Sequence, residues 1–134
     1  MPVSRGQLLK VLAVDDDAKA VELIAVRLQG LAGVVLRASG GLEAIEIARR
    51  ELPDLIVLDL MMPEVNGFQV VDTLSGRSDT ARISIVVLTA KQVTAEDSAR
   101  LNGYVSAIME KAQFDSERFK TEVRRAMSGH NLVA

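Results

Sequence analysis

Short apolar runs of valine, isoleucine and leucine recur along the chain, and most of them do not alternate with polar residues. The runs occupy residues 11–14, 55–58, 83–88 and 105–109, with a weaker one at 34–36. Strands of a parallel sheet covered by helices are buried on both faces, so they read as continuous apolar segments of this length. The pattern therefore predicts five short strands, of which the first, third and fourth are buried on both faces.

The segments between the runs carry apolar residues at helical spacing. One stripe comprises Phe68, Val71 and Leu74, and the last begins at Phe119 and is expected to end near Gly129, a helix stop signal. Strands and helices alternate along the chain, which implies right-handed crossovers. We therefore predict a doubly wound α/β fold, in which helices cover both faces of a five-stranded parallel sheet (a flavodoxin-like (βα)5 arrangement).

Length and composition fit one domain. At 134 residues the chain can bury a single core, and we expect a domain over residues 8–128 with tails at 1–7 and 129–134. A net charge of −2 and an aromatic content of 3% do not favour direct binding to nucleic acid. Cysteine is absent, the one histidine is His130, and no apolar run reaches the roughly 18 residues of a membrane span. These observations predict a soluble cytoplasmic domain without a thiolate or histidine metal centre.

Polar residues follow the predicted strands at the points where the strands end. These residues are Asp15, Asp16, Asp17, Asp59, Thr89, Glu110 and Lys111. The carboxyl ends of parallel strands meet at one edge of the sheet, and ligands of doubly wound folds bind there. The sequence therefore predicts a single site at this edge.

The residue types at this edge favour a hard cation and an anionic oxygen group. Two carboxylates about 4 Å apart repel each other by roughly 4 kcal/mol at an effective dielectric constant of ~20. Mg²⁺ offsets such repulsion, since it takes oxygen ligands and keeps several waters, so two or three carboxylates suffice. Lys111 and Thr89 would supply donors for the oxygens of a phosphoryl group on Asp59.

Four features resemble the receiver domain of bacterial two-component response regulators. They are the stretches VLAVDDD, LPDLIVLDLMMPEVNGF and IVVLTA, and a lysine after the fifth strand; the resemblance extends over residues 10–127. It implies that Asp15 and Asp16 bind Mg²⁺ and that Asp59 accepts a phosphoryl group and contacts the metal. The position of Met61 corresponds to the residue whose backbone carbonyl completes the protein ligands.

The same resemblance assigns roles around the phosphoryl group. The hydroxyl of Thr89 is expected to turn inward and bind the phosphoryl group, the small Ala90 to leave room for it, and Lys111 to pair with its oxygens. Asp59 would attack a phosphohistidine on a sensor histidine kinase or phosphotransfer domain while Mg²⁺ and Lys111 stabilise the developing charge. The chain would then catalyse its own phosphorylation and dephosphorylation without being an enzyme for another substrate.

The resemblance also implies a signalling output. A phosphoryl group adds about −1.5 to −2 charge, which biases a two-state equilibrium. The surface expected to respond comprises the fourth helix (residues 94–101), the fifth strand and the last helix. A downstream effector domain or protein would recognise this surface, and a homodimer on phosphorylation stays open.

Two positions depart from the family pattern. Ala112 stands where receivers usually carry a proline after the lysine, so we expect a trans peptide bond and a more adaptable loop. Ile108 stands where a switch aromatic is frequent, and Tyr104 is close to it but out of register. Similar departures occur in receivers attached to larger sensor proteins, which favours a module of a multidomain chain.

Other residues near these segments have structural interpretations. Asp17 is expected to cap the first helix, and Asp54 to serve the turn into the third strand. Met62 is assigned to the core, and Gly67 to a backbone conformation at a helix start. Glu110 is predicted to be a solvated charge.

Two alternative functions share these residues. A small Mg²⁺-dependent phosphohydrolase would carry its covalent phosphate on Asp15 instead of Asp59, but the chain lacks a D-x-D-x-T pattern and a cap domain. A degenerate receiver would bind partners without phosphorylation. The residues matched to phosphorylation are intact, whereas Ala112 and Ile108 keep this alternative open for signalling.

Overall fold

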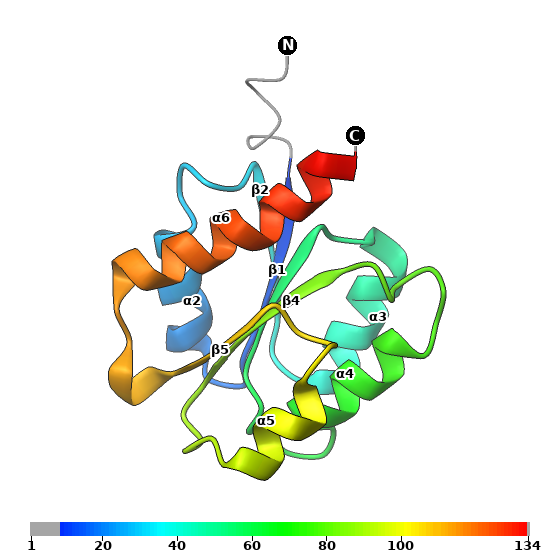
Figure 1. Ribbon diagram of the computed structural model, residues 1–134, viewed down its shortest axis with the longest axis vertical. Coiled ribbons are helices and arrows are strands. Elements are labelled where there is room, and N and C mark those ends of the chain that lie inside the picture. Colours follow the sequence, from blue (N-terminus) through cyan, green and yellow to red (C-terminus); the bar gives the residue numbers. More distant parts are fainter. Residues whose placement is uncertain (1–8, 134) are drawn as a thin grey trace.

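The computed structural model describes residues 9–133, with side chains to residue 128, and the expected tail at 1–7 lies outside them. Five strands and five α-helices alternate along this part of the chain (Figure 1). In chain order the elements are β1 (Lys10–Val14), α2 (Ala18–Arg27), β2 (Val34–Ala38), α3 (Gly41–Glu51), β3 (Leu55–Leu58), α4 (Gly67–Ser75), β4 (Ser84–Thr89), α5 (Ala95–Leu101), β5 (Ala107–Glu110), the 3-10 turn η2 (Lys111–Gln113) and α6 (Ser116–Val133).

All five strands pair in parallel, in the order β2-β1-β3-β4-β5. The order reverses direction between β1 and β3, because β2 was added on one side of β1 and every later strand on the other. Such a reversal is the topological switch point at which doubly wound sheets bind ligands. The predicted flavodoxin-like fold is confirmed.

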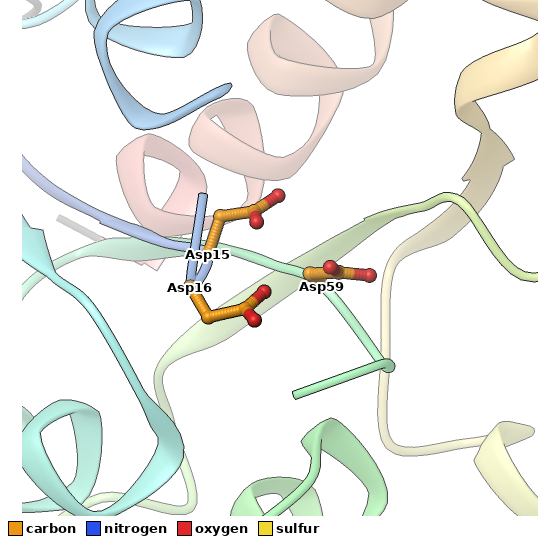
Figure 2. A group of neighbouring side chains, drawn as sticks. All are labelled: Asp15, Asp16 and Asp59. Atoms are coloured by element: carbon orange, nitrogen blue, oxygen red, sulfur yellow. The ribbon is translucent and has the colours of Figure 1, made fainter. Parts of the chain in front are cut away.

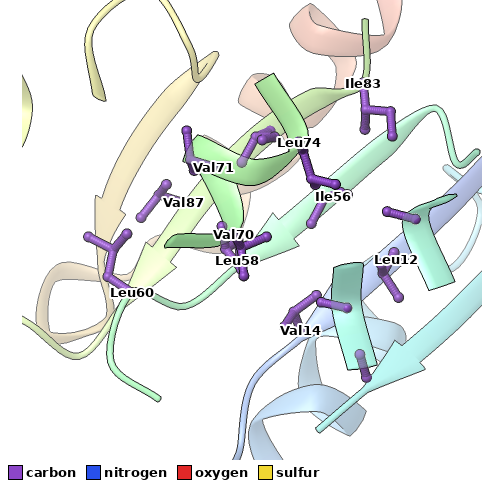
Figure 3. Close-up of a cluster of buried hydrophobic side chains, with 14 of the residues drawn as sticks. Leu12, Val14, Ile56, Leu58, Leu60, Val70, Val71, Leu74, Ile83 and Val87 are labelled. Atoms are coloured by element: carbon purple, nitrogen blue, oxygen red, sulfur yellow. The ribbon is translucent and has the colours of Figure 1, made fainter. Parts of the chain in front are cut away.

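Helices cover both faces of the sheet. Figure 1 shows α2 and α6 on one face and α3, α4 and α5 on the other. Within β1, Val11 and Ala13 pack with α2 and α6, whereas Leu12 and Val14 pack with α3 and α4 (Figure 3). Successive side chains of a strand point to opposite faces, so a strand with a helix layer on each side is apolar at every position. This is why the central runs of the sequence do not alternate.

The last helix is longer than expected. Helix α6 continues to Val133, so the predicted end near Gly129 is wrong. A glycine within a helix costs only about 1 kcal/mol relative to alanine, and it does not by itself end a helix. Phe119, Val123 and Met127 are buried against the sheet and hold the preceding turns.

Candidate functional site

Three aspartates from two neighbouring strands lie together at the carboxyl edge of the sheet. Asp15 and Asp16 follow β1, and Asp59 follows β3, with which β1 pairs in parallel. One carboxylate oxygen from each aspartate lies within 4.8 Å of the other two (Figure 2). Asp15 and Asp59 are 1% and 3% exposed, whereas Asp16 faces solvent. The acidic residues that the sequence placed at one edge are therefore brought together by the fold.

Asp15 has a partner for each carboxylate oxygen. Lys111 Nζ donates to Oδ2 at 2.5 Å, and the backbone N–H of Asp17 donates to Oδ1 at 2.9 Å. Lys111 reaches this position from the start of η2, directly after β5. A buried charge is tolerated when it is paired and hydrogen-bonded, so these contacts fix Asp15 in one orientation.

Asp59 is bound asymmetrically. Its Oδ1 accepts a hydrogen bond from Thr89 Oγ1 at 2.7 Å and another from the backbone N–H of Met61 at 3.1 Å. Its Oδ2 lies 3.9 Å from Lys111 Nζ, which is an ion-pair distance but too long for a hydrogen bond. Oδ1 therefore has two hydrogen bonds, whereas Oδ2 has only the longer ion-pair contact with Lys111.

Burial raises the pKa of the Asp59 carboxyl group above its usual range. The hydrogen bonds from Thr89 and Met61 lower this pKa, the negative charge of Asp15 raises it, and the charge of Lys111 lowers it. Removal of the carboxylate from water outweighs the stabilising contacts. The folded protein thus holds a carboxylate that would be better solvated in the unfolded chain.

Asp59→Asn is expected to raise the free energy of unfolding at neutral pH when divalent cations are absent. The pKa of Asp59 is higher in the folded than in the unfolded protein. The contribution of this group to the free energy of unfolding of the wild type is therefore highest at low pH, where Asp59 is protonated, and falls as the pH rises through the folded pKa. Asparagine does not ionise, and the advantage of the variant should therefore be largest at neutral pH and shrink in acid. Urea unfolding of the wild type and the variant, at neutral and at acidic pH, measures this difference.

A matched control is Asp79→Asn. Asp79 is exposed, and its hydrogen bonds from Arg77 lower its pKa, so its neutralisation should not stabilise the protein. Lower stability of Asp59→Asn than of wild type at neutral pH would contradict the electrostatic account of the site.

The donor set of the cluster fits a hard divalent cation. Three carboxylates converge, two of them are held by hydrogen bonds, and the third, Asp16, is open to solvent. Mg²⁺ prefers oxygen ligands and retains several waters, which an open side of the cluster accommodates. The side chain of Met61 is 54% exposed beside the cluster; participation of its backbone carbonyl stays a prediction.

Gly67 is required by close packing at the site. A Cβ atom at this position would lie 2.7 Å from the Cα of Leu60 and would also collide with the backbone carbonyl oxygen of Asp59. The Gly67 N–H donates to the Leu60 carbonyl at 3.1 Å, which draws the start of α4 onto the end of β3. The predicted reason, a special backbone conformation, is wrong, since the backbone of Gly67 does not have a positive φ.

The loop between β4 and α5 is tied to the site by side-chain acceptors. The backbone N–H of Lys91 donates to Thr89 Oγ1 at 3.1 Å, and Lys91 Nζ pairs with Asp97 at 2.8 Å. The hydrogen bonds that Asp97 receives lower its pKa to about 2. Glu110 was predicted to be solvated, yet its Oε2 accepts a hydrogen bond from the backbone N–H of Val93 at 2.9 Å. That prediction is wrong, because the edge strand brings Glu110 alongside the loop.

Several smaller predictions are confirmed. Asp17 caps α2 by accepting a hydrogen bond from the N–H of Lys19 at 3.0 Å. Asp54 accepts one from the N–H of Lys10 at 2.8 Å at the start of β3, and Met62 is buried in the core.

The positions that depart from the family pattern lie around β5. All peptide bonds between the described residues are trans, including the one before Ala112. Ile108 is partly buried against the α3–α4 side of the core, while Tyr104 is 57% exposed. The side chain of Ala90, next to Thr89, faces solvent.

A family model described as the response regulator receiver domain matches residues 11–124. The chain belongs to this family. Among curated relatives of this receiver domain, the probable transcriptional regulatory protein TcrX of Mycobacterium tuberculosis is 35% identical over 96 residues, which are 72% of this chain and 40% of that protein. Another, a probable transcriptional regulator of Porphyra purpurea, is covered over 34% of its length. The receiver domain thus spans well under half the length of these relatives.

Solved structures agree with the assignment. The chemotaxis protein CheY4 of Vibrio cholerae superposes with a TM-score of 0.79 at 27% identity, over 89% of this chain and 98% of that one. The receiver domain of a Pseudomonas aeruginosa sensor histidine kinase shares the fold, with a TM-score of 0.78 at 21% identity over 90% of this chain and 98% of its own. That structure contains a magnesium ion coordinated in its active site cleft. Among the described residues of this receiver domain, no helix is both long and apolar enough to span a membrane.

Proposed function

We propose that this receiver domain is a phosphorylation switch of a two-component phosphorelay, with Asp59 as the phospho-acceptor. The proposal rests on the groups that surround the Asp59 carboxylate. Asp59 is a buried carboxylate that has a hydroxyl donor on one oxygen, a lysine ammonium near the other, and two further carboxylates within ligand distance. Asp15 lacks this arrangement, since both of its oxygens already accept hydrogen bonds.

The chemistry follows from the two oxygens of Asp59. Oδ1 is held by Thr89 and Met61, so Oδ2 is the oxygen that attacks the phosphorus atom of a phosphohistidine on the partner. The new O–P bond forms as the P–N bond breaks, and the imidazole nitrogen leaves with the electron pair. Asp59 becomes a mixed anhydride of a carboxylic and a phosphoric acid.

The remaining residues stabilise charge during this transfer. Lys111 Nζ, 3.9 Å from Oδ2, is placed to pair with the phosphoryl oxygens, and the Thr89 hydroxyl is directed at the carboxylate that would carry the group. Asp15, Asp16 and Asp59 would hold Mg²⁺, with Met61 as the fourth protein ligand. When bound, the cation neutralises carboxylate repulsion and the charge of the transferring group.

The phosphoryl group would be read at the surface formed by α5, β5 and α6. It adds about −1.5 to −2 charge beside Thr89 and Lys111. Thr89 ends β4 and Lys111 begins η2 directly after β5, so both residues border this surface. We infer that the phosphodonor is a histidine kinase or phosphotransfer domain in the cytoplasm and that the output goes to an effector domain or protein. The net charge of −2 does not favour nucleic acid as a direct partner.

The proposal is tested by intact mass measurement after incubation with acetyl phosphate, with and without Mg²⁺. Wild type should gain the mass of one phosphoryl group only with Mg²⁺, and Asp59→Ala should gain none. An adduct that persists in Asp59→Ala and disappears in Asp15→Ala would instead identify the phosphohydrolase. If no protein gains mass and beryllofluoride also fails to bind, the degenerate receiver is the correct function.

A further inference from the structure

The side chain of Glu110 crosses from the edge strand to the loop between β4 and α5. Glu110 is opposite Thr89 in the parallel register of β4 and β5. From there its Oε2 reaches the backbone N–H of Val93 at 2.9 Å, in a half-buried contact. The Glu110 side chain thus connects the end of β5 to the middle of the loop between β4 and α5.

This loop is held by three hydrogen bonds from its backbone N–H groups to side-chain oxygens. They join Lys91 N to Thr89 Oγ1 at 3.1 Å, Val93 N to Glu110 Oε2 at 2.9 Å, and Thr94 N to Asp97 Oδ2 at 3.0 Å. Thr89 and Asp97 belong to the two elements that the loop connects. Of these three acceptors, Glu110 alone comes from another part of the chain, so it is the contact that anchors the loop to the sheet edge.

The hydroxyl of Thr89 contacts both the loop and Asp59. A hydroxyl has one proton to donate and lone pairs that accept. The N–H of Lys91 occupies the acceptor side of Thr89 Oγ1, and the hydroxyl proton is then directed to Asp59 Oδ1 at 2.7 Å. Lys91 is two residues before Val93, so a loop released at Val93 would also lose the alignment of the Lys91 N–H.

We propose that Glu110 is a positioning residue for the phosphorylation site: it holds the loop at Val93 and so orients the hydroxyl of Thr89 toward Asp59. The last step, from hydroxyl orientation to a bound phosphoryl group, rests on the proposed function. Two consecutive residues, the last of β5 and the first of η2, then act on the site. Lys111 reaches it directly, and Glu110, the preceding residue, acts through the loop and Thr89.

The first test is amide hydrogen exchange measured by NMR on the whole chain. In Glu110→Ala, the amides of Val93 and Lys91 should exchange at least about tenfold faster, since a hydrogen bond to a charged acceptor is lost. Glu110→Gln should restore most of the protection, because its amide oxygen still accepts from Val93. Glu96→Ala, which removes an exposed acid from the first turn of α5, is the matched control and should leave both amides unchanged.

The second test is the lifetime of the phosphoryl group on Asp59 after removal of acetyl phosphate, followed by intact mass. Glu110→Ala should shorten this lifetime several-fold, Glu110→Gln should return it toward the wild-type value, and Glu96→Ala should match wild type. If the wild type takes up no phosphoryl group, the proposed function fails. The exchange rates of the Lys91 and Val93 amides then test the positioning role of Glu110 independently of phosphorylation.

Three results would overturn the inference. The first is faster exchange at Val93 with no change at Lys91, which would make the contact local. The second is a phosphoryl lifetime unaffected by Glu110→Ala in a protein that is phosphorylated. The third is a general loss of protection that includes β1 amides such as that of Leu12, which would mean that Glu110 supports the fold as a whole.

Discussion

Gly67→Ala is expected to lower the free energy of unfolding by about 2–3 kcal/mol, the upper part of the usual range for overpacking. The added Cβ would collide with the backbone of Asp59 and lie 2.7 Å from the Cα of Leu60. A flexible side chain could turn away from such a contact, but backbone atoms at the end of a central strand cannot move without displacing the strand. Urea unfolding at constant pH measures the loss.

The same substitution should impair phosphorylation, because the atoms that must move carry Asp59. Uptake from acetyl phosphate is expected to fall in Gly67→Ala even under conditions where the protein remains folded. Gly40→Ala is the matched control: a Cβ there meets no atom within 4 Å, and the φ of −170° is extended backbone that alanine adopts. Because Gly40 is the N-cap of α3, where alanine is less favourable than glycine, this substitution should cost no more than about 1 kcal/mol. Equal losses in the two variants would contradict the close-packing explanation.

The fold could be predicted from the sequence because each central strand is covered on both sides. Val11 and Leu12 face different helix layers, and both are fully buried. That double burial produces the unbroken apolar runs from which parallel strands were inferred. The end of α6 could not be inferred in the same way. Gly129 lies within the helix, where a single glycine is not enough to stop a helix that has already formed.

The candidate site was predictable for a related reason. Parallel strands end at a common edge, so Asp15, Asp59 and Thr89 had to approach one another once the strand order was known. The contacts that sequence reasoning missed depend on register and on distances between backbones. Glu110 meets the loop only because β5 pairs with β4 in one register, and Gly67 is needed only because α4 starts against β3.

Mg²⁺ is expected to stabilise the wild-type domain against unfolding by about 2.7 kcal/mol at a concentration one hundred times its Kd. The physical reason is the repulsion within the cluster, where burial already raises the pKa of Asp59 and the charge of Asp15 adds to the rise. A cation among the three carboxylates removes this repulsion only in the folded state, where their oxygens lie within 4.8 Å. Thermal or urea unfolding with Mg²⁺, and again after chelation, measures the effect.

Two adjacent aspartates provide the decisive comparison. Asp16 lies in the cluster and faces solvent, so Asp16→Asn should change the stability of the metal-free protein little and should remove most of the Mg²⁺ effect. Asp17 instead caps α2, and asparagine is an equally good cap, so Asp17→Asn should retain both the stability and the Mg²⁺ response. The two substitutions remove the same charge from neighbouring positions, so general electrostatic screening predicts equal responses. A difference between them would therefore arise from direct ligation, and the opposite pattern would place the cation outside the cluster.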